Sequence, residues 1–264
     1  MLDVSVIIPA KNAELLLDEC LASVVRSPPR EIIVVDGLSQ DRTVEIARRH
    51  GARVLSDRGR GLPAARALGV EAARSDRVAL VDADIVLGEG SLEALLDEFE
   101  AGGYTGLQAG LRSVGGPGYW GRALAHHHCT GRSRHWFGLV ATIFRRATLL
   151  AEPFDPRFIS GEDIELRRRL QRRGARFHVS ERTIVTHRFG DGFGFARGQW
   201  LADGAGLGRT VRKEGVRALS LAALPAAAAA RGAALSVVRG EPQWIPYYAC
   251  FVAFNYAGML RPIR

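Results

Sequence analysis

The sequence predicts an α/β protein in which a mostly parallel sheet is flanked by helices and followed by a helical carboxyl-terminal extension. Short β-branched runs alternate with helix-periodic stretches between residues 3 and 87. These runs are apolar throughout, which is typical of strands buried on both faces of a parallel sheet. Beyond residue 190 the composition changes to Gly/Phe-rich, then Ala-rich, then uncharged aromatic segments. The alternation predicts the sheet, and the change in composition predicts the extension.

The predicted elements follow from these periodicities. The predicted strands are short and apolar, and they lie at residues 4–9, 31–37, 52–55, 77–84, 105–113, 137–146, 175–179 and 183–188. The predicted helices show amphipathic spacing, and they lie at residues 13–25, 41–51, 61–74, 90–101 and 161–173. Pro63 fits the third of these helices because proline is tolerated in a first helical turn.

The chain divides by composition into a catalytic region, 1–190, and an extension, 191–264. The glycine-rich start of the extension is interpreted either as a mobile loop that closes over the site or as a plain surface connection. The uncharged run 243–260 has three interpretations: peripheral membrane contact, burial against the catalytic region or a dimer partner, and a true membrane span. The first two are preferred because Pro246, Asn255 and the aromatic residues suit a bilayer centre poorly.

Composition limits the kind of protein and its compartment. With 264 residues and 47% hydrophobic content, the chain can bury a sizeable core. The net charge of +8 suits an anionic partner such as a nucleotide or a phospholipid, but it also fits a general bias toward arginine. The three cysteines form no CxxC pair, and the amino terminus lacks a basic leader. We therefore expect a cytoplasmic protein without disulfides.

Polar residues follow three of the predicted parallel strands, at 9–12, 36–41 and 82–84. Ligands of such sheets bind where the strands end, so these segments are expected to share one edge. On a strand, Asp82 and Asp84 would point the same way, about 7 Å apart. Two carboxylates on one face need a counter-charge, and Mg²⁺ or Mn²⁺ bound to a nucleotide diphosphate would supply it. The alternative is a solvated strand end or an Asp-rich turn.

Other candidates have equally plain structural explanations. Asp36 is either a ligand for a base or ribose, or a structural residue that forms an Asx-turn or caps the next helix. Glu162 and Asp163 open a helix, where the dipole favours acids, or they provide a general base. His187 near a strand end is more often structural than a ligand. The first strand is not followed by the G-x-G-x-x-G motif, which disfavours a dinucleotide oxidoreductase.

A histidine-rich stretch spans residues 126–128, with Cys129 and His135 nearby. Adjacent histidines do not lie on one face of a helix, so we do not expect a zinc site there.

Taken together, five blocks in order resemble glycosyltransferase family 2. "VSVIIPAKN" is similar to that family's "VSVIIPxxN", and "VVDGLSQDRTVEIA" to "VVDGxSxDGTxEIA". "GLPAARALGVEAARSDRVALVDADIVL" resembles "GxxxARNxGxxxAxGDxxxxLDADxxx", and "FDPRFISGEDIELRRRLQRRG" resembles "FDExFxxxEDxdLxxRLxxxG". His187 stands where a histidine often follows. The blocks span residues 4–187. The sequence departs from the family pattern at Gly37, Ala67, Arg77 and Glu152-Pro153. Gly37 stands where the commoner form has a second carboxylate, but none of the departures falls on Asp82, Asp84 or Asp163.

The resemblance implies a GT-A fold, which is Rossmann-like, and assigns roles to individual residues. It implies a set that binds the nucleotide sugar: Pro9, Ala10, Asn12, Asp36, Arg66, Asp82 and Ala83. It implies Asp84, Asp82 and His187 as ligands of a Mg²⁺ or Mn²⁺ cofactor. It implies Asp163, with Glu162 beside it, as the base that deprotonates the acceptor hydroxyl.

The implied function is an inverting, metal-dependent transfer of a hexose-type sugar from a nucleotide sugar, expected to be a UDP-sugar. The expected acceptor is a saccharide, a lipid-linked molecule or a small molecule in cell-envelope polysaccharide, glycolipid or secondary-metabolite synthesis. A peripheral contact with the inner face of the cell membrane and a homodimer stay open. Two alternatives are weighed. A nucleotidyltransferase would need a Gly-rich phosphate loop after the first strand, and a nucleic-acid-binding protein would concentrate its arginines in a stripe; neither is seen.

Overall fold

A computed structural model describes residues 1–130 and 137–261 of the chain. The chain folds into two compact units. The first comprises residues 1–112, 135–157 and 166–188, and the second comprises residues 113–134, 158–165 and 189–264. The second unit therefore includes two segments from within the predicted catalytic region as well as the extension.

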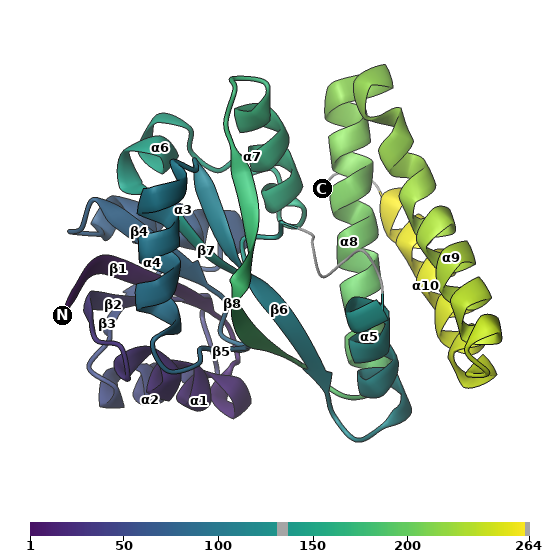
Figure 1. The fold of residues 1–264 in the computed structure, drawn as a ribbon, viewed down its shortest axis with the longest axis horizontal. Coiled ribbons are helices and arrows are strands. Elements are labelled where there is room, and N and C mark those ends of the chain that lie inside the picture. Colours follow the sequence, from purple (N-terminus) through teal and green to yellow (C-terminus); the bar gives the residue numbers. More distant parts are fainter. Residues whose placement is uncertain (131–136, 262–264) are drawn as a thin grey trace. The chain divides into compact units, whose positions relative to one another are not determined.

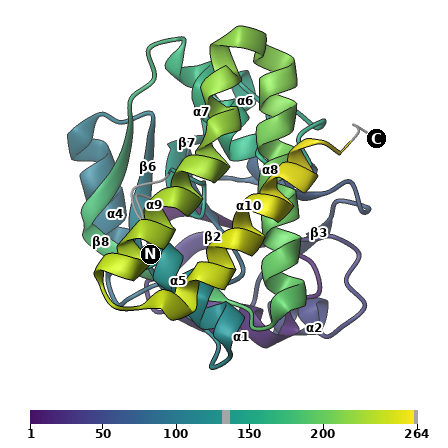
Figure 2. The same ribbon diagram turned by 90° about the vertical axis from the view of Figure 1, so that its right-hand side faces the viewer.

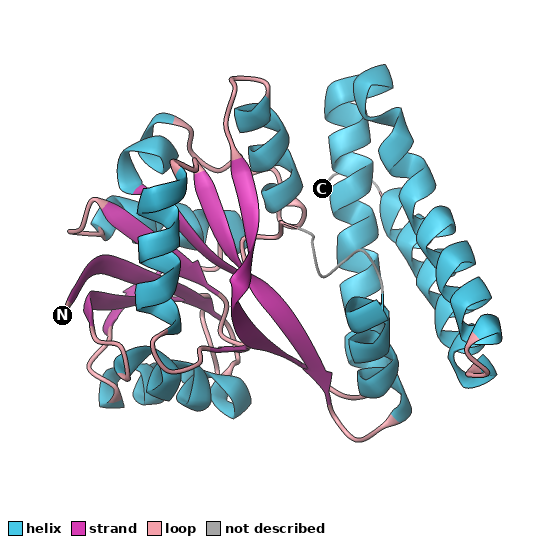
Figure 3. Ribbon diagram, viewed as in Figure 1, coloured by secondary structure: helices cyan, strands magenta, loops and turns pink. Residues whose placement is uncertain are grey.

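The first unit is built on a mixed eight-stranded sheet with helices on both faces (Figure 1; Figure 3). Its strands share the order β3-β2-β1-β4-β7-β6-β8-β5, and their bounds are β1 Leu2–Ala10, β2 Pro29–Asp36, β3 Arg53–Ser56, β4 Arg77–Val81, β5 Ile85–Val86, β6 Gly106–Gly115, β7 Ala141–Arg145 and β8 Phe177–Phe189. Strands β1 to β4 pair in parallel, as predicted. Strand β7 pairs antiparallel with β4 and β6, and β5 pairs antiparallel with β8. These strands form the antiparallel part of the mixed sheet.

Helices cover the sheet because its strands are apolar on both faces. Val6 and Ile8 of β1 join the core beneath one set of helices, whereas Ile7 joins the core beneath the other. The helices of this unit, including one that begins in the second unit, are α1 Glu14–Val25, α2 Thr43–Arg49, α3 Leu62–Ala72, α4 Ser91–Gly102, α6 Arg146–Ala151 and α7 Glu162–Gln171. Five of the six were predicted within a few residues; α6 was not.

One strand boundary differs from the prediction in a way that affects the site. Residues 77–84 were predicted as one strand, but β4 ends at Val81. The amide of Ile85 then bonds to the carbonyl of Asp82 at 3.1 Å, which closes a turn over Asp82, Ala83 and Asp84. The prediction that the two carboxylates share one face of a strand was therefore wrong, because the chain turns there to form β5.

The second unit is helical. Its helical segments are α5 Tyr119–Thr130, α8 Phe193–Glu214, η2 Gly215–Ala223, α9 Leu224–Val238, η3 Pro242–Trp244 and α10 Ile245–Met259. The chain reverses direction at η2, and α10 packs against both α8 and α9 (Figure 2). Trp200, Tyr247 and Tyr248 are buried in its core.

The glycine-rich segment predicted as a loop is instead the 22-residue helix α8. Its glycines allow close backbone approach. A β-carbon on Gly204 would collide with the carbonyl of Asn255 in α10, and one on Gly206 would lie 2.8 Å from the Cα of Gly161. Glycine density in this sequence therefore marks close packing of a helix rather than a loop.

This packing predicts opposite effects for two glycines of the same helix. We expect Gly204→Ala to lower the free energy of unfolding by about 1–3 kcal/mol, because the added methyl overpacks the α8–α10 contact. We expect Gly198→Ala, where a β-carbon meets nothing within 4 Å, to raise it by about 0.5–1 kcal/mol through helix propensity. Chemical denaturation of both variants tests this, and equal effects would contradict the packing explanation.

Candidate functional site

The carboxyl ends of the parallel strands form one edge of the sheet in the first unit. Ala10 of β1 is paired with Asp36 of β2, and Asp36 is paired with Ser56 of β3. Ile7 of β1 is paired with Leu80 of β4, which brings the end of β4 beside the same edge. The three polar segments predicted to converge therefore do so.

The loops after β1 and β2 are bound to each other. The amide of Asn12 donates to Ser39 Oγ at 2.9 Å, and the amide of Gln40 donates to Asn12 Oδ1 at 2.9 Å. Asn12 has a positive φ of 49°, which asparagine tolerates better than most residues. The amide of Gly37 also donates to the carbonyl of Ala10 at 2.9 Å. The turn expected to hold base and ribose is thus fixed before any ligand binds.

Asp36 is buried and holds its own loop. Its carboxylate accepts the amides of Leu38 and Ser39 at 3.2 Å each. This is the Asx-type turn that the sequence offered as the structural alternative. A carboxylate has about four acceptor positions, so these bonds leave acceptor capacity for a ligand N–H.

Asp82 forms an ion pair with a buried arginine. Arg66 on α3 is 1% exposed, and its Nη2 donates to Asp82 Oδ1 at 2.8 Å. The amide of Asp82 also donates to the carbonyl of Val140 at 2.9 Å. Burial raises the pKa of the Asp82 carboxyl above its ordinary value, and the Arg66 charge opposes that rise. Arg66 is thus one counter-charge for the acidic pair.

The β5–β8 pairing places His187 beside Asp84. Ile85 of β5 is paired with His187, and the amide of Arg188 donates to the carbonyl of Asp84 at 3.0 Å. His187 Nε2 then lies 3.3 Å from Asp84 Oδ2. Burial alone would lower the pKa of His187, but the hydrogen bond to Asp84 and the charges of Asp84 and Asp82 raise it above its ordinary value.

The donor atoms at Asp84 fit a hard divalent cation. Within the described part of the chain, Asp84 Oδ1 is buried and has no hydrogen-bond partner. The described residues contain no group of three or more His, Cys, Asp or Glu side chains that could hold a metal by themselves. A cation at Asp84 would therefore need further ligands from phosphate and water, which is how Mg²⁺ is usually bound beside nucleotides.

The second unit gathers a group of carboxylates at the start of α7. Glu162 and Asp163 lie in its first turn, and Asp203 projects from α8. Asp203 is exposed by its solvent-accessible area, yet many protein atoms surround its carboxyl group. This surrounding protein, and then the negative charges of Asp163 and Glu162, raise the pKa of Asp203 to about 7. Asp203 did not stand out in the sequence because it occurs in the segment interpreted as a loop.

The raised pKa of Asp203 predicts a pH-dependent change in stability. The folded protein holds this proton up to about pH 7, whereas an ordinary aspartate loses it near pH 3.8. The ionised carboxyl therefore costs stability as the pH rises from about 4 to above 7. We expect Asp203→Asn to have a higher Tm than wild type at about pH 8. The difference should shrink toward about pH 4, where both side chains are neutral; an advantage that grows on acidification would contradict the assignment.

Two contacts from α8 hold the segment around Glu162 and Asp163. Ser160 Oγ donates to the carbonyl of Ala202 at 2.7 Å. Lys213 Nζ donates to the buried Glu165 Oε1 at 2.7 Å, and it lies 5.2 Å from the ring centroid of Phe158. These contacts fix the first turn of α7 on α8 without using Glu162 or Asp163.

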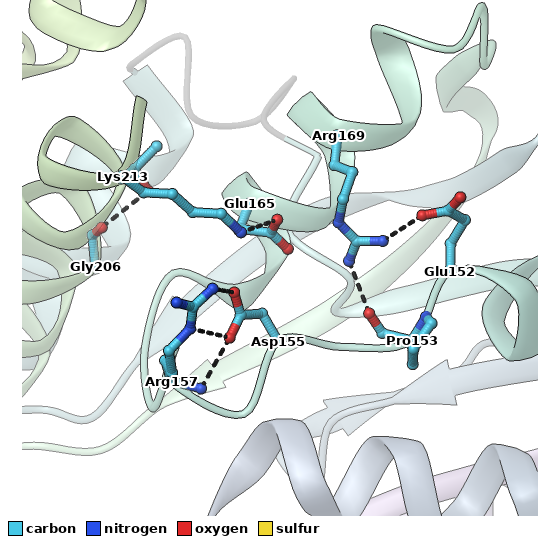
Figure 4. A network of polar contacts seen from close by, with 9 residues as sticks. Glu152, Pro153, Asp155, Arg157, Glu165, Arg169, Gly206 and Lys213 are labelled. Atoms are coloured by element: carbon cyan, nitrogen blue, oxygen red, sulfur yellow. Dashed lines mark hydrogen bonds and ion pairs between the residues drawn. The ribbon is translucent and has the colours of Figure 1, made fainter. Parts of the chain in front are cut away.

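The loop before α7 is fixed within the first unit. Arg169 donates to Glu152 Oε2 at 2.6 Å and to the carbonyl of Pro153 at 2.7 Å (Figure 4). Arg157 forms a two-point ion pair with Asp155, at 2.7 and 2.9 Å. The Glu152-Pro153 departure from the family pattern thus has a local explanation, since Glu152 is an anchor for α7.

The histidine triplet lies on α5, and its three rings contact different aromatic residues. The ring centroid of His126 lies 5.0 Å from that of Trp244, that of His127 lies 4.9 Å from Phe251, and that of His128 lies 4.7 Å from Phe189. Burial lowers the pKa of His127 to about 4. His135 lies outside the described residues.

A family model matches the amino-terminal part of the chain. The profile of glycosyl transferase family 2 matches residues 5–161. The matched range includes Asp36, Arg66, Asp82 and Asp84. It ends just before Glu162 and Asp163, and it excludes His187.

Relatives with similar sequences are glycosyltransferases by name. The 4,4'-diaponeurosporenoate glycosyltransferase of Staphylococcus haemolyticus is 39% identical over 115 residues, which are 40% of this chain and 31% of that protein. The uncharacterized glycosyltransferase EpsJ of Bacillus subtilis is 34% identical over 104 residues, 37% of this chain and 30% of that protein. The chain thus matches about a third of the length of each relative.

Solved structures share the fold. The mannosyltransferase PcManGT of Pyrobaculum calidifontis, in complex with GDP-Man and Mn²⁺, has a TM-score of 0.67 at 18% identity and covers 98% of this chain and 87% of its own. Residues 1–349 of Staphylococcus aureus TarS with UDP give 0.53 at 18% identity, covering 78% and 65%. The fold is therefore the predicted GT-A arrangement with a helical carboxyl-terminal extension.

Proposed function

The chain belongs to glycosyl transferase family 2, and we propose that it transfers a sugar from a UDP-sugar to an acceptor hydroxyl. The observation that carries the proposal is the arrangement of two aspartates after β4. Asp82 contacts Arg66, and Asp84 contacts His187. Both aspartates lie at the sheet edge that also holds Asp36. The UDP named for TarS and the Mn²⁺ named for PcManGT support this proposal, whereas the GDP-Man named for PcManGT supports a nucleotide-sugar donor without supporting UDP.

The donor side follows from the residues of this edge. Asp36 accepts an N–H of the base, while Pro9, Ala10 and Asn12 line the base and ribose. Asp82, Ala83 and Arg66 contact the ribose and the adjoining phosphates. Asp84, His187 and Asp82 hold Mg²⁺ or Mn²⁺. That cation, when bound, supplies Lewis-acid stabilisation of the negative charge on the departing diphosphate.

The acceptor side follows from the first turn of α7. We assign Asp163 as the general base that takes the proton of the attacking hydroxyl, with Glu162 beside it. A single displacement at the anomeric carbon, with one base, inverts the configuration. An α-linked donor would therefore give a β-linked product.

The proposal also covers the acceptor of the sugar and the place in the cell where the transfer occurs. We propose a saccharide, lipid-linked or small-molecule acceptor in cell-envelope polysaccharide, glycolipid or secondary-metabolite synthesis. The reaction takes place in the cytoplasm or at the inner face of the cell membrane. A homodimer stays an alternative arrangement of the chain.

A panel of nucleotide sugars tests the function. The full chain is incubated with UDP-, GDP- and dTDP-sugars, with Mn²⁺, Mg²⁺ or a chelator, and nucleoside diphosphate release is measured. We expect UDP release that requires the divalent cation. Release of pyrophosphate from a sugar phosphate and a nucleoside triphosphate would contradict the proposal and indicate a nucleotidyltransferase, and tight RNA binding without any turnover would indicate a nucleic-acid-binding protein.

A further inference from the structure

One face of α9 is apolar and exposed. The buried residues of α9 recur at helical spacing along one side: Pro225, Ala229, Gly232 and Ser236. The other side is open to solvent, and its residues are almost all apolar: Leu224, Ala226, Ala227, Ala230, Arg231, Ala234, Val237 and Val238. A helix of a soluble protein normally places charged residues on such a face. The exposed side of α9 therefore has the composition of a contact surface.

The preceding segment η2 extends this surface. Val216 is 87% exposed and Leu219 is 60% exposed, while Val237 and Val238 at the other end of α9 are 63% and 83% exposed. We call residues Val216, Leu219, Leu224, Val237 and Val238, together with the exposed alanines of α9, the η2–α9 surface. Removing several large aliphatic side chains of this kind from water is favourable.

The charges of the η2–α9 surface are mostly positive. Between residues 214 and 241 the sequence contains three arginines, Arg217, Arg231 and Arg239, and one glutamate at each end, Glu214 and Glu241. All three arginines are exposed. The net positive charge of this segment is attracted to an anionic bilayer.

We propose that the η2–α9 surface binds the chain peripherally to an anionic phospholipid bilayer. The run 243–260, which the sequence favoured for membrane contact, is less suited to this, because α10 buries Tyr247, Tyr248, Asn255 and Gly258 within the second unit. The membrane-binding element is thus the neighbouring alanine-rich helix. This inference does not depend on the identity of the sugar donor.

The surface fits contact with a membrane better than passage through it. By length and composition alone, the continuous helical stretch Phe193–Val238 contains a segment apolar enough to span a bilayer. That stretch is not one straight helix, since the chain reverses at η2 (Figure 1). Helix α9 itself has 15 residues, about 22 Å, which is shorter than the hydrocarbon core of about 30 Å. It therefore lies in the interface.

The same charges argue against a second copy of the chain as the occupant. Two η2–α9 surfaces packed together would bring two sets of Arg217, Arg231 and Arg239 close to one another. Glu214 and Glu241 flank these arginines, but two carboxylates against three arginines leave each surface with a net positive charge. Anionic head groups supply the compensation that a homodimer lacks.

Vesicle flotation tests the proposal. The full chain is mixed with phosphatidylcholine vesicles that contain phosphatidylglycerol, or with phosphatidylcholine vesicles alone, at low and high salt. We expect the protein to float with the anionic vesicles, with about tenfold weaker binding to the neutral vesicles and at high salt. Failure to bind the anionic vesicles would overturn the proposal.

Matched variants locate the contact. Leu219→Glu/Val238→Glu is expected to reduce binding to anionic vesicles at least about tenfold. Leu150→Glu/Ile184→Glu makes the same charge change at exposed positions of the first unit and should bind like wild type. Circular dichroism and UDP binding check that both variants are folded. Equal loss in both pairs, or a wild-type dimer in sedimentation that only the first pair dissociates, would overturn the proposal.

Discussion

Asp163→Asn is expected to abolish sugar transfer while UDP binding stays nearly unchanged. The amide cannot accept the proton of the acceptor hydroxyl, and general-base catalysis is typically worth about 10²–10⁴-fold. The nucleotide-binding residues of the sheet edge are not altered. UDP release is measured under saturating donor and acceptor, and UDP affinity is measured by calorimetry.

Two further variants make this result specific. Asp97→Asn makes the same chemical change at an exposed position of α4 and should keep full activity. Glu162→Gln is expected to reduce turnover less than Asp163→Asn, because Glu162 is assigned a place beside the base. If Asp163→Asn lost UDP binding and turnover in parallel, Asp163 would not be the base.

Asp84→Asn is expected to lower cation-dependent turnover by about a hundredfold or more. Oδ1 of Asp84 is a buried carboxylate oxygen at the edge of the sheet with no hydrogen-bond partner among the described residues, so it is well placed to hold a cation. Loss of several kcal/mol of stabilisation at the departing diphosphate corresponds to this factor. Turnover is measured over a Mn²⁺ titration.

Binding of Mn²⁺ gives a second readout that does not need activity. Electron paramagnetic resonance of free Mn²⁺, in the presence of UDP, should show weaker uptake by Asp84→Asn than by wild type. Glu89→Gln, an exposed acid in the loop after β5, serves as the control. Wild-type Mn²⁺ uptake by Asp84→Asn would mean that the cation is held elsewhere.

The amino-terminal half of the fold could be predicted because its signals are local. Each parallel strand is a short apolar run, and each polar residue of the edge follows its strand directly in the sequence. Asp36 and Asn12 therefore converge by topology alone. The prediction that Asp82 and Asp84 end a strand was close, but the turn that separates β4 from β5 depends on the pairing of β5 with β8, about 100 residues away in the sequence.

The ion pair of Arg66, the helix α8 and the position of Asp203 could not be predicted, because they depend on contacts between segments that are distant in the sequence. Arg66 was assigned from the family resemblance, whereas its ion pair with Asp82 required the packing of α3 on the sheet. Helix α8 was interpreted as a loop because glycine weakens helices in isolation; the compensating contacts with Asn255 and Gly161 come from distant segments. Asp203 was missed for the same reason. The division at residue 190 stays a prediction, although the structure groups residues 158–165 with α8.

The ion pair between Lys213 and Glu165 makes the carboxyl-terminal helices inseparable from the acidic end of α7. Glu165 is 1% exposed, and its positive partner comes from the last turn of α8. A shortened chain that ended before α8 would lose that lysine together with the backbone of Ala202 that Ser160 contacts. A chain trimmed to the family-matched residues 5–161 would lose Asp163 itself, and one that ended after β8 would keep Asp163 without the contacts that support its helix turn. The extension is best regarded as the scaffold of the proposed acceptor side, and its sequence is expected to vary with the acceptor.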